Sequence, residues 1–217
     1  MDEYFHSNKY PSHRESLYNE YIGTTIERCT FACEVIPRFS DEKLFINGEM
    51  YDNPYKLLKK RTISDKIIDR LLPSSFCFIH GDPTLQNLMQ SEGKVWFIDP
   101  KSKFGNIWLY GDPKYDFAKL YYSFVGNYDR FNAGGYDLLV TDSGFDYEIE
   151  RAKFANLDDW YLRYLRDKLN IDPIDIKLIH SLIWLRAVGY VLPRSIEQSI
   201  VAFLNGTVLF NEVMNER

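Results

Sequence analysis

Proline residues and polar capping residues divide the end of the chain into three consecutive segments with helical periodicity. Apolar residues recur at helical spacing over 157–169, 173–191 and 195–215. The breaks fall at Asn170-Ile171-Asp172-Pro173 and at Pro193, and proline cannot continue a helix. The spacing therefore predicts an all-helical C-terminal part over residues 150–217.

Composition narrows the class of protein that this chain can be. Its 217 residues fit one large domain or two small ones, and a net charge of −5 gives no global attraction for nucleic acid or an anionic membrane. Cys29, Cys33 and Cys77 are too few and odd in number for a disulfide framework, so we expect reduced thiols. The N-terminus lacks a signal-peptide pattern, and no segment approaches the ~20 apolar residues of a membrane span. These features predict a soluble cytoplasmic protein without a nucleic-acid partner or membrane span.

The first third of the chain indicates a short lead-in followed by helices. Residues 1–14 are polar and turn-rich, and we expect this opening segment to be loosely held. Helical periodicity over 15–36, with Ser16 as a candidate N-cap, and over 54–72 predicts two helices. Between them, Asn47-Gly48 marks a turn within a short extended stretch. We expect residues 15–72 to be predominantly helical.

Residues 75–127 have a different character, with short β-prone runs and polar loops. A strand over 75–82 leads into a Gly-Asp-Pro loop, and 87–99 reads as a hairpin with its turn at Ser91–Lys94. A helix is expected from Asp112-Pro113 to about Gly126, followed by a small strand pair or a loop over 132–150. No repeat or linker separates these parts, so residues 15–217 are predicted to form one α+β domain. That domain is mostly helical, with a small central β-hairpin.

Three oxygen-bearing side chains follow the predicted strands of this core. Asp82 lies in the Gly-Asp-Pro loop that directly follows the predicted strand, Asn87 lies at the return of the same loop, and Asp99 ends the hairpin. Phosphoryl transfer from a nucleotide needs hard oxygen ligands for Mg²⁺ and a carboxylate that orients and deprotonates the acceptor hydroxyl. Two neighbouring loop ends could bring a base, an amide ligand and a carboxylate ligand together. Each residue also has a purely structural interpretation, as a turn or capping residue, which the combined pattern disfavours.

The spacing repeats the kinase pattern H-x-D-x-x-x-x-N followed by a metal-binding aspartate. With Gly81 in place of the protein-kinase arginine, the stretch His80 to Asn87, then Ile98-Asp99-Pro100, then GDPxYDxAK (111–119), resembles the aminoglycoside phosphotransferase/choline kinase family. The chain is most similar to bacterial members associated with surface-polysaccharide (capsule) synthesis. The likeness extends weakly over about residues 17–215.

The resemblance implies a fold, an activity and a set of site residues. The fold would be the C-terminal lobe of a protein-kinase-like structure, and the activity would be phosphorylation of a hydroxyl on a sugar, amino alcohol or related metabolite. ATP or another nucleoside triphosphate and Mg²⁺ would be required. Asp82 would be the catalytic base, Asn87 and Asp99 would hold the metal, and the helices of residues 150–217 would form the acceptor pocket. The residues expected to support the loop are His80, Gly81, Asp112 and Asp116.

Lys101 and Lys103 follow the metal-binding aspartate of the pattern. They could meet an anionic substrate group or a phosphate, or they could be a solvated pair, and the sequence does not separate these alternatives.

The β-rich N-terminal lobe expected for a complete enzyme of this family is not recognisable in the sequence. Neither a G-x-G-x-x-G loop nor a Walker A motif precedes His80, and Lys9 is the only lysine before Lys43. A piece of a longer chain, a split enzyme and an inactive remnant would each account for this, and we expect a truncated or partial chain. Two other functions stay open: a non-catalytic kinase-like binding or scaffold module, and a metal-dependent hydrolase using Asp82 and Asp99. The absence of clustered histidines disfavours the hydrolase.

Overall fold

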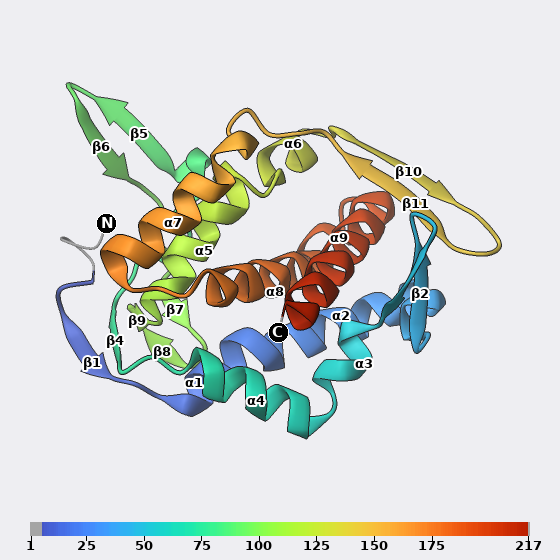
Figure 1. Ribbon diagram of the computed structural model, residues 1–217, viewed down its shortest axis with the longest axis horizontal. Helices are drawn as coiled ribbons and strands as arrows, with labels where there is room; N and C mark the ends of the chain where they lie inside the picture. Colours follow the sequence, from blue (N-terminus) through green and yellow to red (C-terminus); the bar gives the residue numbers. More distant parts are fainter. Residues whose placement is uncertain (1–5, 217) are drawn as a thin grey trace.

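The computed structural model describes residues 6–216 as an α+β fold that is mostly helical (Figure 1). Two long helices, α8 and α9, run through its middle, and shorter helices and small sheets surround them. The α-helices are α1 (Arg14–Tyr18), α2 (Thr24–Val35), α3 (Pro54–Leu58), α4 (Arg61–Leu71), α5 (Pro113–Phe124), α6 (Tyr128–Asn132), α7 (Asp158–Leu169), α8 (Pro173–Val191) and α9 (Ile196–Asn215).

The strands form four small sheets rather than one large one. A three-stranded antiparallel sheet has the order β1-β4-β9, a four-stranded sheet has the order β10-β11-β2-β3, and β5-β6 and β7-β8 are separate two-stranded ribbons. Their bounds are β1 (Lys9–Pro11), β2 (Lys43–Ile46), β3 (Glu49–Asp52), β4 (Ser75–Phe78), β5 (Leu88–Ser91), β6 (Lys94–Phe97), β7 (Lys103–Phe104), β8 (Ile107–Trp108), β9 (Tyr110–Gly111), β10 (Tyr136–Val140) and β11 (Phe145–Ile149). The β5-β6 hairpin projects from the body of the molecule (Figure 1).

Helix α8 is the centre of the hydrophobic core. It contacts α2, α5 and α9, and its residues are buried on nearly every side, as expected for a helix that is apolar all round. Trp184 on α8 and Phe203 and Phe210 on α9 are fully buried. The side chain of Arg186 on α8 is also buried, and a buried charge needs an oppositely charged or hydrogen-bonding partner.

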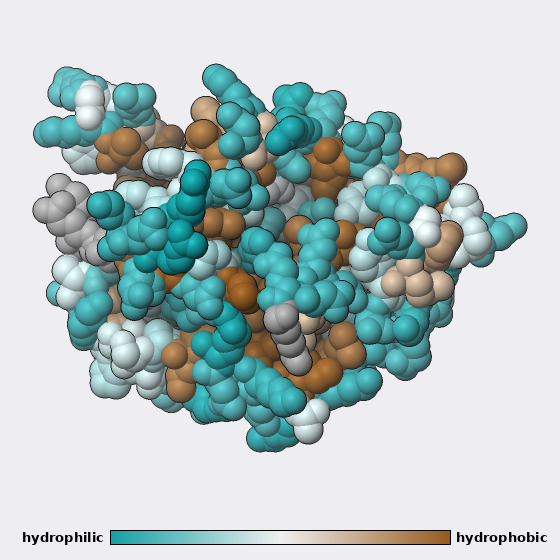
Figure 2. Space-filling model, viewed as in Figure 1, coloured by the Kyte–Doolittle hydropathy of each residue, from teal (hydrophilic) through white to brown (hydrophobic). Residues whose placement is uncertain are grey.

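An apolar groove lies between α4, α8 and α9. It is lined by Ile63, Ile67, Leu178 and Val213, and Figure 2 shows hydrophobic side chains gathered beside the C-terminus in this region. No helix within residues 6–216 is long and apolar enough to cross a membrane.

Most element predictions are confirmed where proline or glycine punctuates the chain. Helix α8 begins at Pro173 with Asp172 as its N-cap, and α9 begins after Ser195, whose hydroxyl accepts from the Gln198 amide. The β5-β6 hairpin forms as predicted but projects from the molecule instead of lying at its centre (Figure 1), and the turn predicted at Asn47-Gly48 joins the paired strands β2 and β3. The region 132–150 is the strand pair β10-β11.

Two helix predictions need correction. The helix expected over 15–36 is interrupted by a π-helical turn at Asn19–Gly23, and its N-cap is His13, not Ser16. The helix expected over 54–72 breaks into α3 and α4 because Lys60 adopts an extended backbone. In both cases, periodicity indicated a helix but did not locate the interruption.

The opening segment, as far as it lies within the described residues, is held more firmly than expected. Strand β1 pairs with β4, with Tyr10 opposite Phe76, and the side chain of His6 is buried against Phe117. Residues 1–5 of that segment lie outside the described part of the chain. Cys29 and Cys77 are buried and Cys33 is half-buried, and none of the three is in a disulfide, in agreement with the predicted reduced thiols.

Candidate active site

The loop from His80 to Asn87 is held by a buried carboxylate on α5. Both oxygens of Asp116 accept backbone hydrogen bonds, Oδ2 from the His80 amide at 2.8 Å and Oδ1 from the Gly81 amide at 2.7 Å. The Nε2 atom of His6 also lies 3.2 Å from Asp116 Oδ2. Asp116 is fully buried, so it fixes the loop backbone from behind and does not reach solvent.

Asp116 reaches the loop because of how α5 begins. Asp112 is the N-cap residue, and its Oδ1 accepts from the Lys114 amide at 3.0 Å, while Pro113 occupies the first helical position. The other oxygen of Asp112 accepts from the Tyr21 hydroxyl at 3.0 Å. Burial raises the pKa of Asp112 to about 6, although the charge of Lys114 opposes the shift. The cap is therefore a buried polar anchor rather than a residue exposed to substrate.

Gly81 occupies a position at which any side chain would be strained. Its φ is +79°, which favours glycine, and a Cβ built there would lie 2.8 Å from the Cβ of Lys101. The close approach lets the Lys101 amide donate to the His80 carbonyl at 2.8 Å. The chain after Asp99 is thereby fastened to the loop that carries Asp82.

Asp99 is held beside the loop through Ile98, which precedes it, and through Lys101, which follows two residues later and whose amide contacts His80. The Ile98 amide donates to the Asn87 carbonyl at 3.0 Å, and His80 Nε2 donates to the Ile98 carbonyl at 3.0 Å. Asp99 itself has φ +56° in the left-handed region, which aspartate tolerates better than most residues. Its side chain is exposed, so its carboxylate is accessible from the cleft described below.

Asp82 is the carboxylate on which the loop contacts converge. Its Oδ1 forms an ion pair with Lys119 Nζ of α5 at 2.7 Å, and its Oδ2 accepts from Asn87 Nδ2 at 3.1 Å. The same Asn87 nitrogen donates to the Asp82 carbonyl at 2.8 Å. Because Nδ2 makes both contacts, Oδ1 of Asn87 is the amide atom left to act as a ligand.

These residues lie on one cleft of about 530 Å³. Of the residues predicted for the site, Gly81, Asp82, Asn87, Asp99 and Lys101 line it. Those that the structure places elsewhere are His80, Asp112 and Asp116, which are buried behind it, and Lys103, which is exposed on β7.

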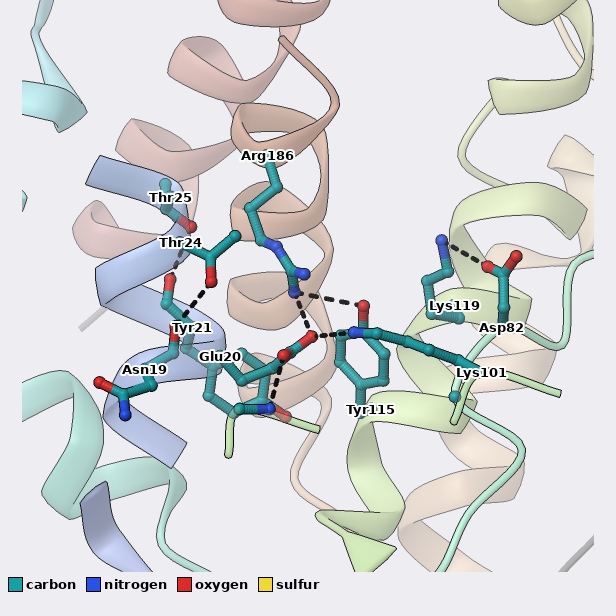
Figure 3. A network of polar contacts seen from close by, with 12 residues as sticks. Asn19, Glu20, Tyr21, Thr24, Thr25, Asp82, Lys101, Tyr115, Lys119 and Arg186 are labelled. Carbon is teal, nitrogen blue, oxygen red and sulfur yellow. Dashed lines mark hydrogen bonds and ion pairs between the residues drawn. The ribbon is translucent and has the colours of Figure 1, made fainter. Parts of the chain in front are cut away.

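A second charged group, the Glu20 cluster (Glu20, Lys101, Tyr115 and Arg186), closes another side of the cleft (Figure 3). Glu20 Oε1 accepts from Lys101 Nζ and from Arg186 Nη1, both at 2.6 Å, and its Oε2 accepts from the Gly105 amide at 2.9 Å. Arg186 Nη1 also lies 3.2 Å from the Tyr115 hydroxyl. Burial alone would raise the pKa of Glu20, but Arg186 and Lys101 outweigh burial and lower it to about 2.

The geometry agrees with a comparison of the sequence with protein families. The model of the phosphotransferase enzyme family (APH) matches residues 40–156, more than half of the chain. The chain belongs to this phosphotransferase family. No curated protein and no solved structure matches it.

The part of the chain that matches the family contains the loop but not the whole cleft. Asp82, Asn87, Asp99 and Lys119 fall within residues 40–156, whereas the cleft residues Arg28 and Arg186 come from α2 and α8 outside that range. One wall of the site is thus supplied by segments that the family model does not cover.

Sequence reasoning missed four charged residues of the site: Glu20, Arg28, Lys119 and Arg186. Lys119 lies within the GDPxYDxAK stretch, so its position in that motif was the available signal. Arg186 is the one Asp, Glu, Lys or Arg in the apolar stretch 178–191, which indicates a buried pair but not its partner. Glu20 and Arg186 are 166 residues apart, and no local pattern predicts that contact.

The donor atoms at the cleft fit Mg²⁺ better than a transition metal. Asn87 and Asp99 offer hard amide and carboxylate oxygens, and Mg²⁺ is commonly bound by one or two such ligands together with substrate phosphates and water. Within residues 6–216, there is no group of three or more His, Cys, Asp or Glu side chains that could hold a metal by itself.

Proposed function

We propose that this phosphotransferase is a kinase that transfers the γ-phosphoryl group of ATP, or of another nucleoside triphosphate, to a hydroxyl of a small molecule. The observation that carries the proposal is the presence of Asp82, Asn87 and Asp99 on the same cleft. A sugar hydroxyl is the first acceptor to test, because the sequence resembles members associated with surface-polysaccharide synthesis. We place the reaction in the cytoplasm, where the triphosphate is made.

Asp82 is proposed to orient the acceptor hydroxyl and take its proton. Its Oδ1 is fixed by Lys119, and Oδ2 is on the side of Asn87, so the carboxylate has a defined direction. Phosphoryl transfer depends on positioning and charge neutralisation more than on a strong base, so a carboxylate of ordinary basicity suffices.

Asn87 and Asp99 are proposed to hold Mg²⁺. When bound, this ion would bridge the phosphates and neutralise the charge that develops on transfer. The contacts on both sides of Asp99 support the assignment, because they fix the aspartate backbone relative to Asn87 while leaving its carboxylate exposed.

The remaining predicted residues are assigned positioning roles or none. His80, Gly81, Asp112 and Asp116 are proposed to fix the loop, for which their buried backbone and side-chain contacts are the support. Lys101 is proposed to help shape the cleft through Glu20, and we assign no role to Lys103, which does not line it.

We further propose that these residues act as the C-terminal lobe of a kinase-like enzyme. The helical surroundings of the loop support this, since the sequence resemblance relates such a helical part to that lobe. A second lobe that covers the nucleotide would lie on the same longer chain or on a separate one.

The test is release of ADP from Mg²⁺-ATP in the presence of a panel of sugars and amino alcohols, with Asp82→Asn and Asp99→Asn as the variants. Loss of acceptor-dependent release in both variants, with an unchanged melting temperature, is the expected result. Acceptor-independent release of phosphate would instead favour a hydrolase. Mg²⁺-dependent nucleotide binding without turnover, measured by calorimetry, would favour the non-catalytic module.

A further inference from the structure

The cleft carries more positive than negative side chains. The cations on its lining are Arg28, Lys101, Lys119 and Arg186, whereas its carboxylates are Asp82 and Asp99. Glu20 is buried behind the lining and is shared between Lys101 and Arg186. A protonated amine would meet repulsion here, and an anion would be attracted.

Arg28 is the cation of the cleft that lacks a carboxylate partner. Within the described residues, the contact recorded for its guanidinium is from Nη1 to the backbone carbonyl of Arg186 at 3.0 Å. No carboxylate lies within ion-pair distance of it in residues 6–216. The pKa of Arg28 is lowered by burial and by the charge of Arg186, so two guanidinium groups repel each other at this point.

Arg186 has an unused donor at the same place. Its side chain is about nine-tenths buried, and Nε has no hydrogen-bond partner within residues 6–216. A buried donor without a hydrogen-bond acceptor costs free energy, and an oxyanion is the acceptor that binds a guanidinium best. Arg28 and Arg186 both line the cleft, so their two guanidinium groups are placed to donate to one negatively charged group there.

We propose that the acceptor carries a second group, a phosphate or a carboxylate, that binds to Arg28 and Arg186. This rests on the proposed function, because it places the acceptor hydroxyl at Asp82 and the anionic group at the α2–α8 wall. In Figure 3, Arg186 and Glu20 lie on one side of Tyr115, and the Asp82–Lys119 pair lies on the other. Tyr128 and Tyr190 also line the cleft and give it an aromatic surface, as small-molecule sites commonly have.

The triphosphate is the other source of an oxyanion in this cleft. Its phosphates would be held with the metal by Asn87 and Asp99, which lie at the two ends of the β5-β6 hairpin. Arg28 and Arg186 come from different helices, α2 and α8, away from that hairpin, so we assign them to the acceptor rather than to the triphosphate.

Binding without nucleotide tests the proposal. The probes are glycerol, glycerol 3-phosphate, glucose, glucose 6-phosphate, glucuronate and glucosamine, and the readouts are the melting temperature and the calorimetric affinity of the full chain. We expect the phosphorylated and carboxylated probes to bind at least about tenfold more tightly than the neutral and amine-bearing ones. Equal binding across the panel, or no binding of any anionic probe, overturns the proposal.

Variants separate the two sources of the oxyanion. Arg28→Gln should weaken the binding of the anionic probes about tenfold and leave the affinity for ATP within about twofold of the wild-type value. Arg28→Lys keeps the charge and should keep most of the affinity for the anionic probes. Arg151→Gln, at an exposed arginine away from the cleft, is the matched control and should change neither. Equal weakening of ATP and of glycerol 3-phosphate by Arg28→Gln would reassign the arginines to the nucleotide and overturn the proposal.

These outcomes are independent of turnover. A chain that binds anionic probes through Arg28 but shows no phosphoryl transfer would contradict the proposed function and sustain the anion site. Turnover that prefers neutral or amine-bearing acceptors would sustain the proposed function and contradict the anion site.

Discussion

Two carboxylates, Asp82 on the cleft and Glu20 behind its lining, each pair with a lysine at nearly the same distance, yet their surroundings differ. The Asp82–Lys119 contact is 2.7 Å with 38% of the aspartate side chain exposed, and the Glu20–Lys101 contact is 2.6 Å with 4% of the glutamate exposed. Both oxygens of Glu20 are occupied by donors, so Glu20 is a structural anion. Asp82 is fixed but open, which is the condition that a catalytic base requires.

Ion pairing alone therefore does not distinguish the carboxylate proposed as the base from the buried one. What separates the two is the route by which each is held. Both oxygens of Glu20 are taken up by donors of a buried cluster. The oxygens of Asp82 contact Lys119 and Asn87 at the cleft, and its loop backbone is in addition fixed from behind by Asp116. The Asp82 carboxylate therefore keeps access to the cleft while its position is determined from behind.

The largest expected effect is loss of turnover in Asp82→Asn. Removing the proposed base while keeping the side-chain shape should reduce acceptor-dependent ADP release about 10³-fold. Asp137→Asn, at an exposed position of β10, is the matched control and should keep the wild-type rate. A wild-type rate in Asp82→Asn would remove the distinction between the two carboxylates.

The next largest effect is a loss of stability in Glu20→Gln. The substitution leaves Lys101 and Arg186 without their shared anion, and breaking a buried pair in this way should cost about 3 kcal/mol of unfolding free energy. Urea denaturation measures the change. Glu150→Gln, which breaks the exposed pair with Arg130, is the control and should cost less than about 1 kcal/mol. Similar losses of unfolding free energy in both variants would show that the buried Glu20 cluster stabilises the fold no more than an exposed ion pair does.

Gly81→Ala should destabilise the loop by about 2 kcal/mol, because it combines a left-handed backbone with a close approach to Lys101. Gly93→Ala separates the two causes, since Gly93 has φ +73° but nothing within 4 Å of a built Cβ. That control should cost about 1 kcal/mol. Thermal unfolding of both variants gives the difference, and equal losses would mean that the contact with Lys101 does not restrict residue 81.

The smallest effect is a pH dependence that belongs to Glu20. Its pKa of about 2 in the folded protein lies below its ordinary value of 4.5, so at acidic pH the unfolded chain binds more protons than the folded protein does. The stabilisation is complete above about pH 4.5 and is lost as the pH falls towards 2. Between pH 7 and pH 4, the wild type should lose roughly 1 kcal/mol more than Glu20→Gln. Parallel pH profiles for the two proteins would contradict the assignment.

Local signals in the sequence predicted much of the fold. Asp112-Pro113, Asp172-Pro173 and Ser195 mark helix starts through capping and proline chemistry that act over a few residues. The helix break at Lys60, where no proline or glycine occurs, was not predicted. The parallel pairing of Phe145 with Ile46 was not predicted either, because it joins segments far apart in the sequence.

The residues of the candidate site also fall into two groups, those that local sequence spacing predicts and those that only long-range packing brings to the cleft. The residues of the loop were found because their spacing is fixed within 20 residues of chain, from His80 to Asp99. Arg28 and Arg186 reach the cleft only through the packing of α2 against α8, which a one-dimensional pattern does not encode.

The contact between His6 and Asp116 makes the start of the chain part of the loop's support. The carboxylate that holds the His80 and Gly81 amides also meets an imidazole from the segment that leads into β1. The segment is linked to the loop by this shared carboxylate and by the pairing of β1 with β4, the strand that leads into the loop. Fusion partners and affinity tags attached ahead of residue 6 are therefore best compared with C-terminal ones before any rate is interpreted.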